Sequence, residues 1–453
     1  MMPNVASVSS GSLASVPRRQ QQQQWPRGPV NDLHRIARDG LAELAMGLLA
    51  FGWFNIDQGD PGGWTPLVFA TYHNHPSVVR ILLDKGANLS IPTDRGFVAL
   101  HVSVQEGHLA VTNMLIEGGA DLEATAGGCT PLHLAVAGGH SQVVTALIQA
   151  GANVNHRALD GATPLYAAAW NDKVECIRLL LRAKADPFLT RAQPSGRRFT
   201  PLDAAAQNGH SGVARELIPH LGSDAIGGGA RAGVTALRLA AQHGHVNVMA
   251  VLTDAGVVDT GSALCGAVGF GTEATVSYLL EQEQDRKEPR GGVYVNSRID
   301  RGCDWPALFL SATNGRPCAP RLARLLVDAG ADATSAVRVR DPAGSVIFND
   351  TPLTAVTSNL VGMKFQGKDA SEEQLHALEA IRRLLLQVEA ARAVSWVWPN
   401  YVPAITDAGD GARRTTVAST IESPLRRMLP TLRLRATRQR LPWVVLSRYS
   451  KKL

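Results

Sequence analysis

The sequence has few cysteines and few aromatic residues for its 453 positions, and no long uninterrupted apolar run. Its five cysteines are odd in number and form no Cys-x-x-Cys pair, so we expect reduced core thiols and a cytoplasmic or nuclear location. The longest apolar stretch, residues 41–54, contains Glu43 and is too short to span a bilayer. Aromatic residues make up only 5% of the chain, which favours thin helices packed through small side chains over one bulky core.

The positive charge of the chain is concentrated near its end. The formal net charge is +6, yet residues 411–453 hold eleven Lys and Arg against a single acid, Glu422. The rest of the chain has 34 basic and 38 acidic residues and is therefore slightly acidic. Residues 1–30 are rich in Ser and Gln, and we expect them to be a disordered leader rather than a transit peptide.

A short motif recurs along the chain at nearly constant spacing. It begins at Thr65, Val98, Thr130, Thr163, Thr200 and Thr235, and most copies read Thr-Pro-Leu. The first three intervals are 33, 32 and 33 residues, and the next two, 37 and 35, indicate short insertions. Threonine is a good helix N-cap, and proline is tolerated at the first helical position because the N–H it lacks would be unpaired there. Each copy therefore predicts the start of a short helix.

Two further elements complete each repeat. A Gly-His step follows the first helix, as at Gly107-His108 and Gly139-His140, and glycine supplies the left-handed conformation that ends a helix. A second helix with an apolar stripe ends at Gly-Ala-Asn or Gly-Ala-Asp, as at 151–153. The spacing and these motifs resemble those of the ankyrin-repeat family. The resemblance implies an all-α solenoid of helix-turn-helix units that are joined by β-hairpin-like turns.

The predicted array covers residues 31–392. Residues 31–62 form an N-terminal capping unit without Thr-Pro, residues 63–259 form clear repeats, and residues 260–392 form degenerate repeats with insertions. We expect loops at the insertions, residues 281–300 and 336–350, and a final second helix from about Ser371 to Ala391. Residues 393–453 are assigned to a linker and an Arg-rich tail.

The sequence offers no catalytic constellation. Residues 269–274 fit the pattern G-x-G-x-x-A, but they follow an expected helix rather than a strand, so a dinucleotide is not expected. His73 and His75 lie on a repeat turn, and no further Cys or carboxylate completes a metal site. We therefore expect no enzyme activity, no cofactor, no metal and no small-molecule substrate.

The resemblance implies instead that a protein partner binds the turn tips and short helices on a concave face, with the chain acting as a scaffold or adaptor. Two columns, each made of the residues at one equivalent position in successive repeats, carry aromatic or amide side chains there that the repeat motif does not require. They are Trp64, Phe97 and Phe199 before the helix start, and Tyr72, Trp170, Asn171 and Gln242 before the Gly-His step. The alternative is that these rings pack against neighbouring hairpins and only stiffen the stack. The partner's identity is not encoded in these columns, and a monomer is expected.

The tail leaves three alternatives open. Its arginines, Arg426, Arg427, Arg433, Arg435, Arg438 and Arg440, alternate with apolar residues at helical spacing. They form a solvated extension, or they contact nucleic acid or an anionic membrane. In the third alternative, Pro424-Leu425 and Leu441-Pro442 resemble the ends of a suppressor-of-cytokine-signalling box, although Leu429 stands where that family has cysteine. This resemblance implies a substrate receptor of a ubiquitin ligase.

Overall fold

A computed structural model describes residues 32–50, 55–193, 196–222, 231–258, 261–270, 272–284, 295–296, 306–313, 316–334, 337–340, 346–365 and 372–401. These residues fall into two compact units, one that extends to Asn296 and one that begins at Pro306. Both units are built mainly of helices. No helix of the described residues is both long enough and apolar enough to cross a membrane.

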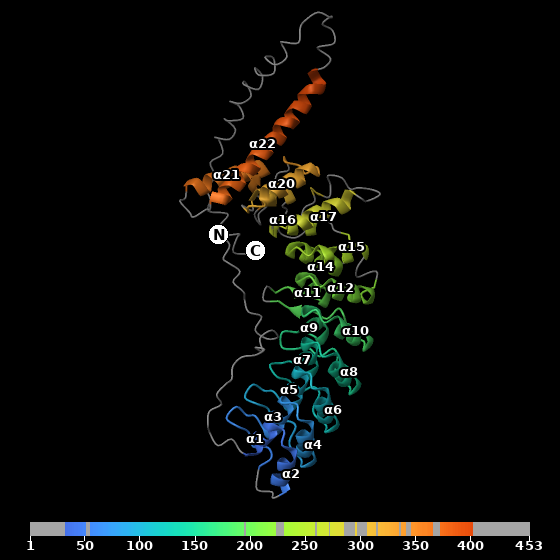
Figure 1. The fold of residues 1–453 in the computed structure, drawn as a ribbon. Coiled ribbons are helices and arrows are strands. Elements are labelled where there is room, and N and C mark those ends of the chain that lie inside the picture. The colour runs from blue at the N-terminus through green and yellow to red at the C-terminus, as the bar shows by residue number, and fades with distance from the viewer. Residues whose placement is uncertain are drawn as a thin grey trace, which may run out of the picture. The chain divides into compact units, whose positions relative to one another are not determined.

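The first unit is a stack of helix pairs in sequence order (Figure 1). The pairs are α1 (Asp32–Asp39) with α2 (Ala42–Ala50), α3 (Pro66–Tyr72) with α4 (Pro76–Asp84), α5 (Ala99–Glu106) with α6 (Leu109–Glu117), α7 (Pro131–Gly138) with α8 (Ser141–Gln149), α9 (Pro164–Trp170) with α10 (Val174–Arg182), α11 (Pro201–Asn208) with α12 (Ser211–Leu217), α14 (Arg231–His243) with α15 (Val246–Asp254), and α16 (Ser262–Phe270) with α17 (Glu273–Gln284). A single 3₁₀ turn, η1 (Ile218–His220), follows α12.

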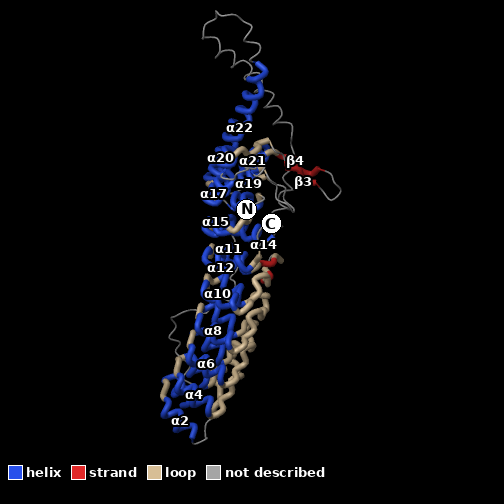
Figure 2. The backbone as a smooth tube through the Cα atoms, turned by 90° about the vertical axis from the view of Figure 1, so that its right-hand side faces the viewer, coloured by secondary structure: helices blue, strands red, loops and turns tan. Residues whose placement is uncertain are grey.

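The helices of this unit form two layers. The first helix of each pair packs on the first helices before and after it, and the second helices pack on one another in the same way. The loops that lead from a second helix to the next first helix, here called fingers, gather along one side of the stack (Figure 2). One finger carries a short antiparallel hairpin, β1 (Arg191–Ala192) and β2 (Arg198–Phe199). The all-α solenoid predicted from the sequence is confirmed.

Threonine and proline set the starts of several first helices. The hydroxyl of Thr65 accepts from the N–H of Val68 at 3.3 Å, and Pro66 is the first helical residue. The same arrangement begins α9 at Thr163 and α11 at Thr200. Leucine follows proline and is buried in each case, because the first helix faces both of its neighbours in the stack.

The glycines of the Gly-His steps meet two requirements. Gly107 has φ 75°, in the left-handed region that glycine adopts without strain. A Cβ at this position would also lie 2.5 Å from Nδ1 of His140, which belongs to the next repeat. Gly209 and His245 have the same relation at 2.6 Å. Glycine therefore ends the helix and leaves room for the histidine ring of the following unit.

The structure corrects the expected start of one helix. We expected a helix to begin near Thr235, but α14 begins four residues earlier, at Arg231. Alanine at position 236 has a backbone N–H and does not hold the preceding residue in an extended conformation, as proline would. The turn of helix before Thr235 is thus permitted, and α14 is longer than the other first helices of this unit.

The second unit contains α19 (Ala307–Thr313), α20 (Ala319–Asp328), β3 (Val337–Arg340), β4 (Val346–Asp350), α21 (Pro352–Phe365) and α22 (Glu372–Tyr401). Within it, α19 packs against α20 and α21, and α22 packs against the same two helices. Two expectations were wrong here. Residues 337–350 contain the antiparallel β3–β4 hairpin rather than only a loop, and α22 extends ten residues beyond Ala391, so the expected boundary at 392 falls inside a helix.

The segment expected to form the first insertion loop, residues 281–300, also differs from the prediction. α17 continues to Gln284, so the segment that we expected to be a loop from residue 281 begins as helix. The described start of this segment, residues 281–284, therefore continues an existing helix.

Candidate functional site

Histidines from the Gly-His steps, together with His75 at the equivalent position after Asn74, tie the ends of the first helices together. Nε2 of each ring lies 2.9–3.2 Å from a backbone carbonyl of the preceding repeat, in the pairs His75–Arg38, His108–Tyr72, His140–Gln105, His210–Trp170 and His245–Gln207. A carbonyl only accepts, so Nε2 is the donor. From α5 onward, each accepting residue lies three positions before the histidine of its own repeat. In the repeat of α9, Lys173 stands in the place of that histidine. His75 was predicted to lie on a repeat turn, and its bond to the carbonyl of Arg38 agrees with this prediction.

A second set of polar residues is buried at the starts of the first helices. Nδ1 of His133 lies 2.8 Å from Oγ1 of Thr130, and its Nε2 donates to the carbonyl of Ala162 in the next finger at 3.2 Å. Burial lowers the pKa of His133 to about 4, against the opposing effect of the bond to Ala162. His133 is therefore neutral near pH 7 and serves as a structural bridge between repeats.

Asp203 occupies the same position in α11. Its Oδ2 accepts from the N–H and the hydroxyl of Thr200, each at 2.9 Å. Burial raises the pKa of this carboxyl to about 6, although the bonds from Thr200 and the charge of Arg238 act in the opposite direction. Burial also raises the pKa of the Cys176 thiol to about 11, so this cysteine is a poor nucleophile at neutral pH.

The aromatic residues at the N-terminal end of the array contact one another. The ring centroid of Trp64 lies 5.3 Å from that of Phe69 and 5.5 Å from that of Tyr72, the latter edge to face. Tyr72 is 43% exposed and Trp64 is half-buried. Phe97 is also half-buried, with its ring 5.7 Å from His101. These rings pack within the stack and still present Tyr72 to solvent.

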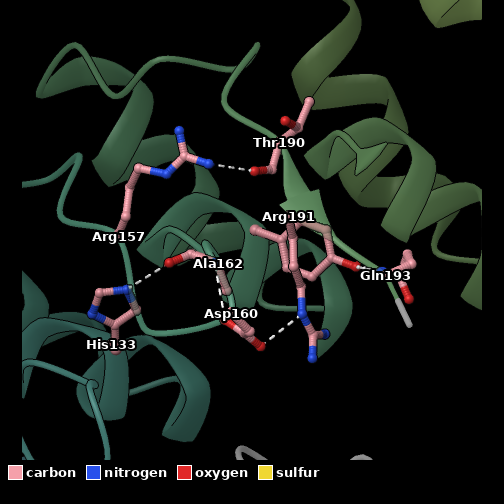
Figure 3. A network of polar contacts seen from close by, with 8 residues as sticks. His133, Arg157, Asp160, Ala162, Thr190, Arg191 and Gln193 are labelled. Atoms are coloured by element: carbon pink, nitrogen blue, oxygen red, sulfur yellow. Dashed lines mark hydrogen bonds and ion pairs between the residues drawn. The ribbon is translucent and has the colours of Figure 1, made fainter. Parts of the chain in front are cut away.

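A second aromatic site lies beside the β1–β2 finger. The rings of Tyr166 and Trp170 stack at 6.3 Å with an angle of 18° between their planes. The guanidinium carbon of Arg191 lies 5.4 Å from the centroid of Tyr166 and 5.9 Å from that of Trp170. Nε of Arg191 pairs with Oδ2 of Asp160 at 2.8 Å (Figure 3). The planar cation is thus held between an aromatic pair and a carboxylate.

The neighbouring fingers are linked by further polar contacts. Arg157 donates to the carbonyl of Thr190 at 2.8 Å, and Nε2 of Gln193 donates to the hydroxyl of Tyr166 at 3.2 Å (Figure 3). Arg157, Asp160 and Arg191 were not predicted from the sequence, because their contacts depend on which fingers lie side by side. The interval of 37 residues between Thr163 and Thr200 was the available signal, since it gives this finger its extra length.

The remaining predicted site residues differ in their surroundings. Phe199 is only 8% exposed, because it pairs with Arg191 across the hairpin and faces the core, so it offers little surface to a partner. Nδ2 of Asn171 donates to the carbonyl of Ala167 at 2.8 Å and caps α9. Gln242 is half-buried, and its side chain lies against Gly266 of α16. Their binding of a partner stays a prediction.

The six arginines predicted to form a basic tail lie outside the described residues, and so do the residues that resemble a suppressor-of-cytokine-signalling box. Within the described residues, no group of three or more His, Cys, Asp or Glu side chains could hold a metal ion. His73, which was considered as half of a metal pair, stacks on the ring of His75 at 6.2 Å.

Comparisons with known proteins agree with this architecture. A family model described as "Ankyrin repeats (3 copies)" matches residues 33–126 and 123–191. Human "Ankyrin repeat and SOCS box protein 3" is 40% identical over 178 residues, which are 38% of this chain and 33% of that protein. "E3 ubiquitin-protein ligase KEG" of Arabidopsis thaliana is 31% identical over 273 residues, 56% of this chain and 17% of that protein.

A third relative belongs to a different class of protein. Human "Transient receptor potential cation channel subfamily A member 1" is 30% identical over 229 residues, 49% of this chain and 20% of that protein. The chain thus spans about a third of the SOCS box relative and smaller shares of the other two. Most of each relative therefore lies outside the matched stretch.

Proposed function

Since the chain belongs to the ankyrin-repeat proteins, whose repeats mediate protein–protein interaction, we propose that it is a non-catalytic scaffold that binds one protein partner on its finger face. The finger face is the surface formed by the fingers and the first helices of residues 55–284. Stacked repeats make such a surface rigid before the partner arrives, so little ordering entropy is lost on binding.

The observation that carries this proposal is the partial exposure of aromatic rings at the ends of the first helices. Tyr72 is 43% exposed and touches Trp64, and Trp170 is half-buried beside Arg191. Rings that are held by their neighbours and open on one side lose little rotamer freedom on binding, and Tyr, Trp and Arg dominate the energetics of protein interfaces.

Partner capture from a cell extract tests the proposal. We expect the full chain to retain a protein that is lost with Tyr72→Ala or Trp170→Ala while the melting temperature stays within a few degrees. Met46→Ala is the matched control, because Met46 is 54% exposed but lies on the second helix α2, outside the finger face. Equal capture by all three variants would refute the role of the aromatic sites.

The names of two relatives favour a second candidate function, that of a substrate receptor for a ubiquitin ligase. One relative carries a SOCS box by name, and another is named as a ubiquitin ligase. In this case the finger face selects the substrate, and the segment after α22 recruits the ligase. We expect elongin or cullin subunits to be captured by the full chain and lost from a chain that ends after Tyr401. The end of α22 is the better truncation point, because a cut at residue 393 would remove part of the helix.

A further inference from the structure

The finger of residues 155–162 carries at its turn a leucine that projects into solvent. Leu159 is 87% exposed, more than any other large hydrophobic residue that the structure describes. Two earlier fingers have the same turn, in which the N–H of the last glycine donates to the carbonyl three residues before it at 2.8–2.9 Å. Their residues at the position of Leu159 are Pro61 and Asp94. The turn accepts several residue types, so its geometry does not account for an exposed leucine.

The backbone around Leu159 is held by contacts on both sides. Oδ1 of Asp160 accepts from the N–H of Ala162 at 3.0 Å, and the N–H of Ala192 in the next finger donates to the carbonyl of Asp160 at 3.2 Å. Toward the preceding finger, a Cβ at Gly128 would lie 2.4 Å from Cγ of Leu159, so the leucine passes directly over a glycine backbone. A side chain held in this way loses little conformational freedom when a partner covers it.

A chain of contacts joins this turn to the aromatic pair on α9. Asp160 follows Leu159 in the sequence, and its Oδ2 lies 2.8 Å from Nε of Arg191 (Figure 3). The guanidinium carbon of Arg191 lies 5.9 Å from the ring centroid of Trp170, which is half-buried. Leu159 and Trp170 therefore belong to one surface, and the pair of Arg191 and Asp160 connects them.

The balance of charge on this surface favours a protein as its ligand. Arg191 and Asp160 neutralise each other, and both side chains are mostly buried. A nucleic acid gains affinity by placing phosphates on unpaired cations, which this pair does not supply. A membrane would hold a single leucine weakly, because binding to a bilayer scales with the apolar area that enters it. Apolar side chains of a protein can cover both Leu159 and Trp170 without bringing a charge to the pair between them.

We infer that the surface formed by Leu159, the pair of Arg191 and Asp160, and Trp170 binds a segment of the partner protein through apolar side chains, one against Leu159 and one against the open side of Trp170. This inference rests on the proposed function, because it names the chemistry of the partner for the same finger face. It also adds Leu159 as a contact residue that neither aromatic column contains.

The test is a selection of random peptides displayed on phage against the full chain. We expect the enriched peptides to share apolar residues. Leu159→Ala should weaken their affinity by at least about tenfold, because most of the apolar area that binding buries at this residue is lost. Trp170→Ala should weaken the same peptides. Fluorescence anisotropy measures the affinities.

The control makes the same substitution outside the finger face. Leu44 is a leucine on α2 that is 57% exposed, and Leu44→Ala should change peptide affinity by less than about twofold. Because Leu159 is so exposed, Leu159→Ala should also leave the melting temperature within a few degrees of the parent, so a loss of binding cannot come from unfolding.

The other outcomes separate this inference from the scaffold function. Peptides that depend on only one of Leu159 and Trp170, on neither, or on charged residues alone would overturn the inference and leave the scaffold function intact. Selection of no peptide by a folded chain would count against both. Binding of phosphatidylcholine vesicles that Leu159→Ala abolishes, and that the peptides do not inhibit, would assign the leucine to a lipid surface and overturn the inference.

Discussion

Replacing Asp203 with asparagine should change how the stability of the repeat array depends on pH. Asp203 is a carboxyl group enclosed at the first turn of α11, where it is 2% exposed and accepts two bonds from Thr200. Burial raises its pKa from 3.8 to about 6. The folded chain therefore keeps this proton over a pH range in which the unfolded chain has released it.

The size of the effect follows from that difference in pKa. The stability that the protonated group contributes is complete below the unfolded pKa of 3.8 and is lost as the pH rises through about 6. Two pKa units correspond to about 3 kcal/mol, and about 2 kcal/mol of this falls between pH 4 and pH 7. Asparagine does not titrate. As the pH rises from 4 to 7, the free energy of unfolding of the variant should therefore rise by about 2 kcal/mol relative to that of the parent.

Hydrogen exchange of the amides in α11, corrected for the intrinsic exchange rate at each pH, measures this local free energy of opening. Comparing the change with pH, rather than stability at one pH, removes any constant penalty for placing an amide NH₂ in this site. Asp84→Asn, at an exposed carboxylate at the end of α4, is the control and should leave the pH dependence unchanged. Identical pH dependence in Asp203→Asn and the parent would refute the reasoning.

Two further substitutions test how closely the repeats follow one rule. Lys173→His should place an imidazole near the carbonyl of Ala137, three residues before His140. The new bond should raise the free energy of unfolding by about 1 kcal/mol in urea denaturation. An unchanged midpoint would show that the bond does not form. Lys184 has φ 62°, where other repeats have glycine, so Lys184→Gly should stabilise the chain by about 0.5–1 kcal/mol in the same assay, and a lower midpoint would contradict the assigned strain.

The starts and ends of the helices in the clear repeats could be predicted from the sequence, because they depend on local chemistry. Thr65 and Pro66 define the start of α3 through a cap and a missing N–H, and Gly107 ends α5 through its left-handed conformation. The start of α14 could not be located in the same way, since Ala236 imposes no such restriction. The β3–β4 hairpin had a local signal in the alternating Val and Arg of 337–340, in a segment that was expected to be an insertion loop.

The surroundings of the candidate site residues were less accessible from the sequence. The column that contains Phe199 predicted an exposed ring, but hairpin pairing with Arg191 turns this ring toward the core. Trp170 was identified by its position, whereas Arg191 and Asp160 come from two different fingers. Such contacts depend on the distance between successive fingers, and an inserted residue changes them without changing the repeat motif.

The junction between the repeat of α7 and the repeat of α9 is fastened differently from its neighbours. Lys173 replaces the histidine that would tie the Gly-His ends of these repeats, while the bond from His133 to Ala162 joins them at the finger end. In a stack whose units touch only their neighbours, each junction is held by its own contacts. The two repeats beneath the aromatic pair of Tyr166 and Trp170 are therefore joined at the finger end without the histidine tie that the junctions on either side have.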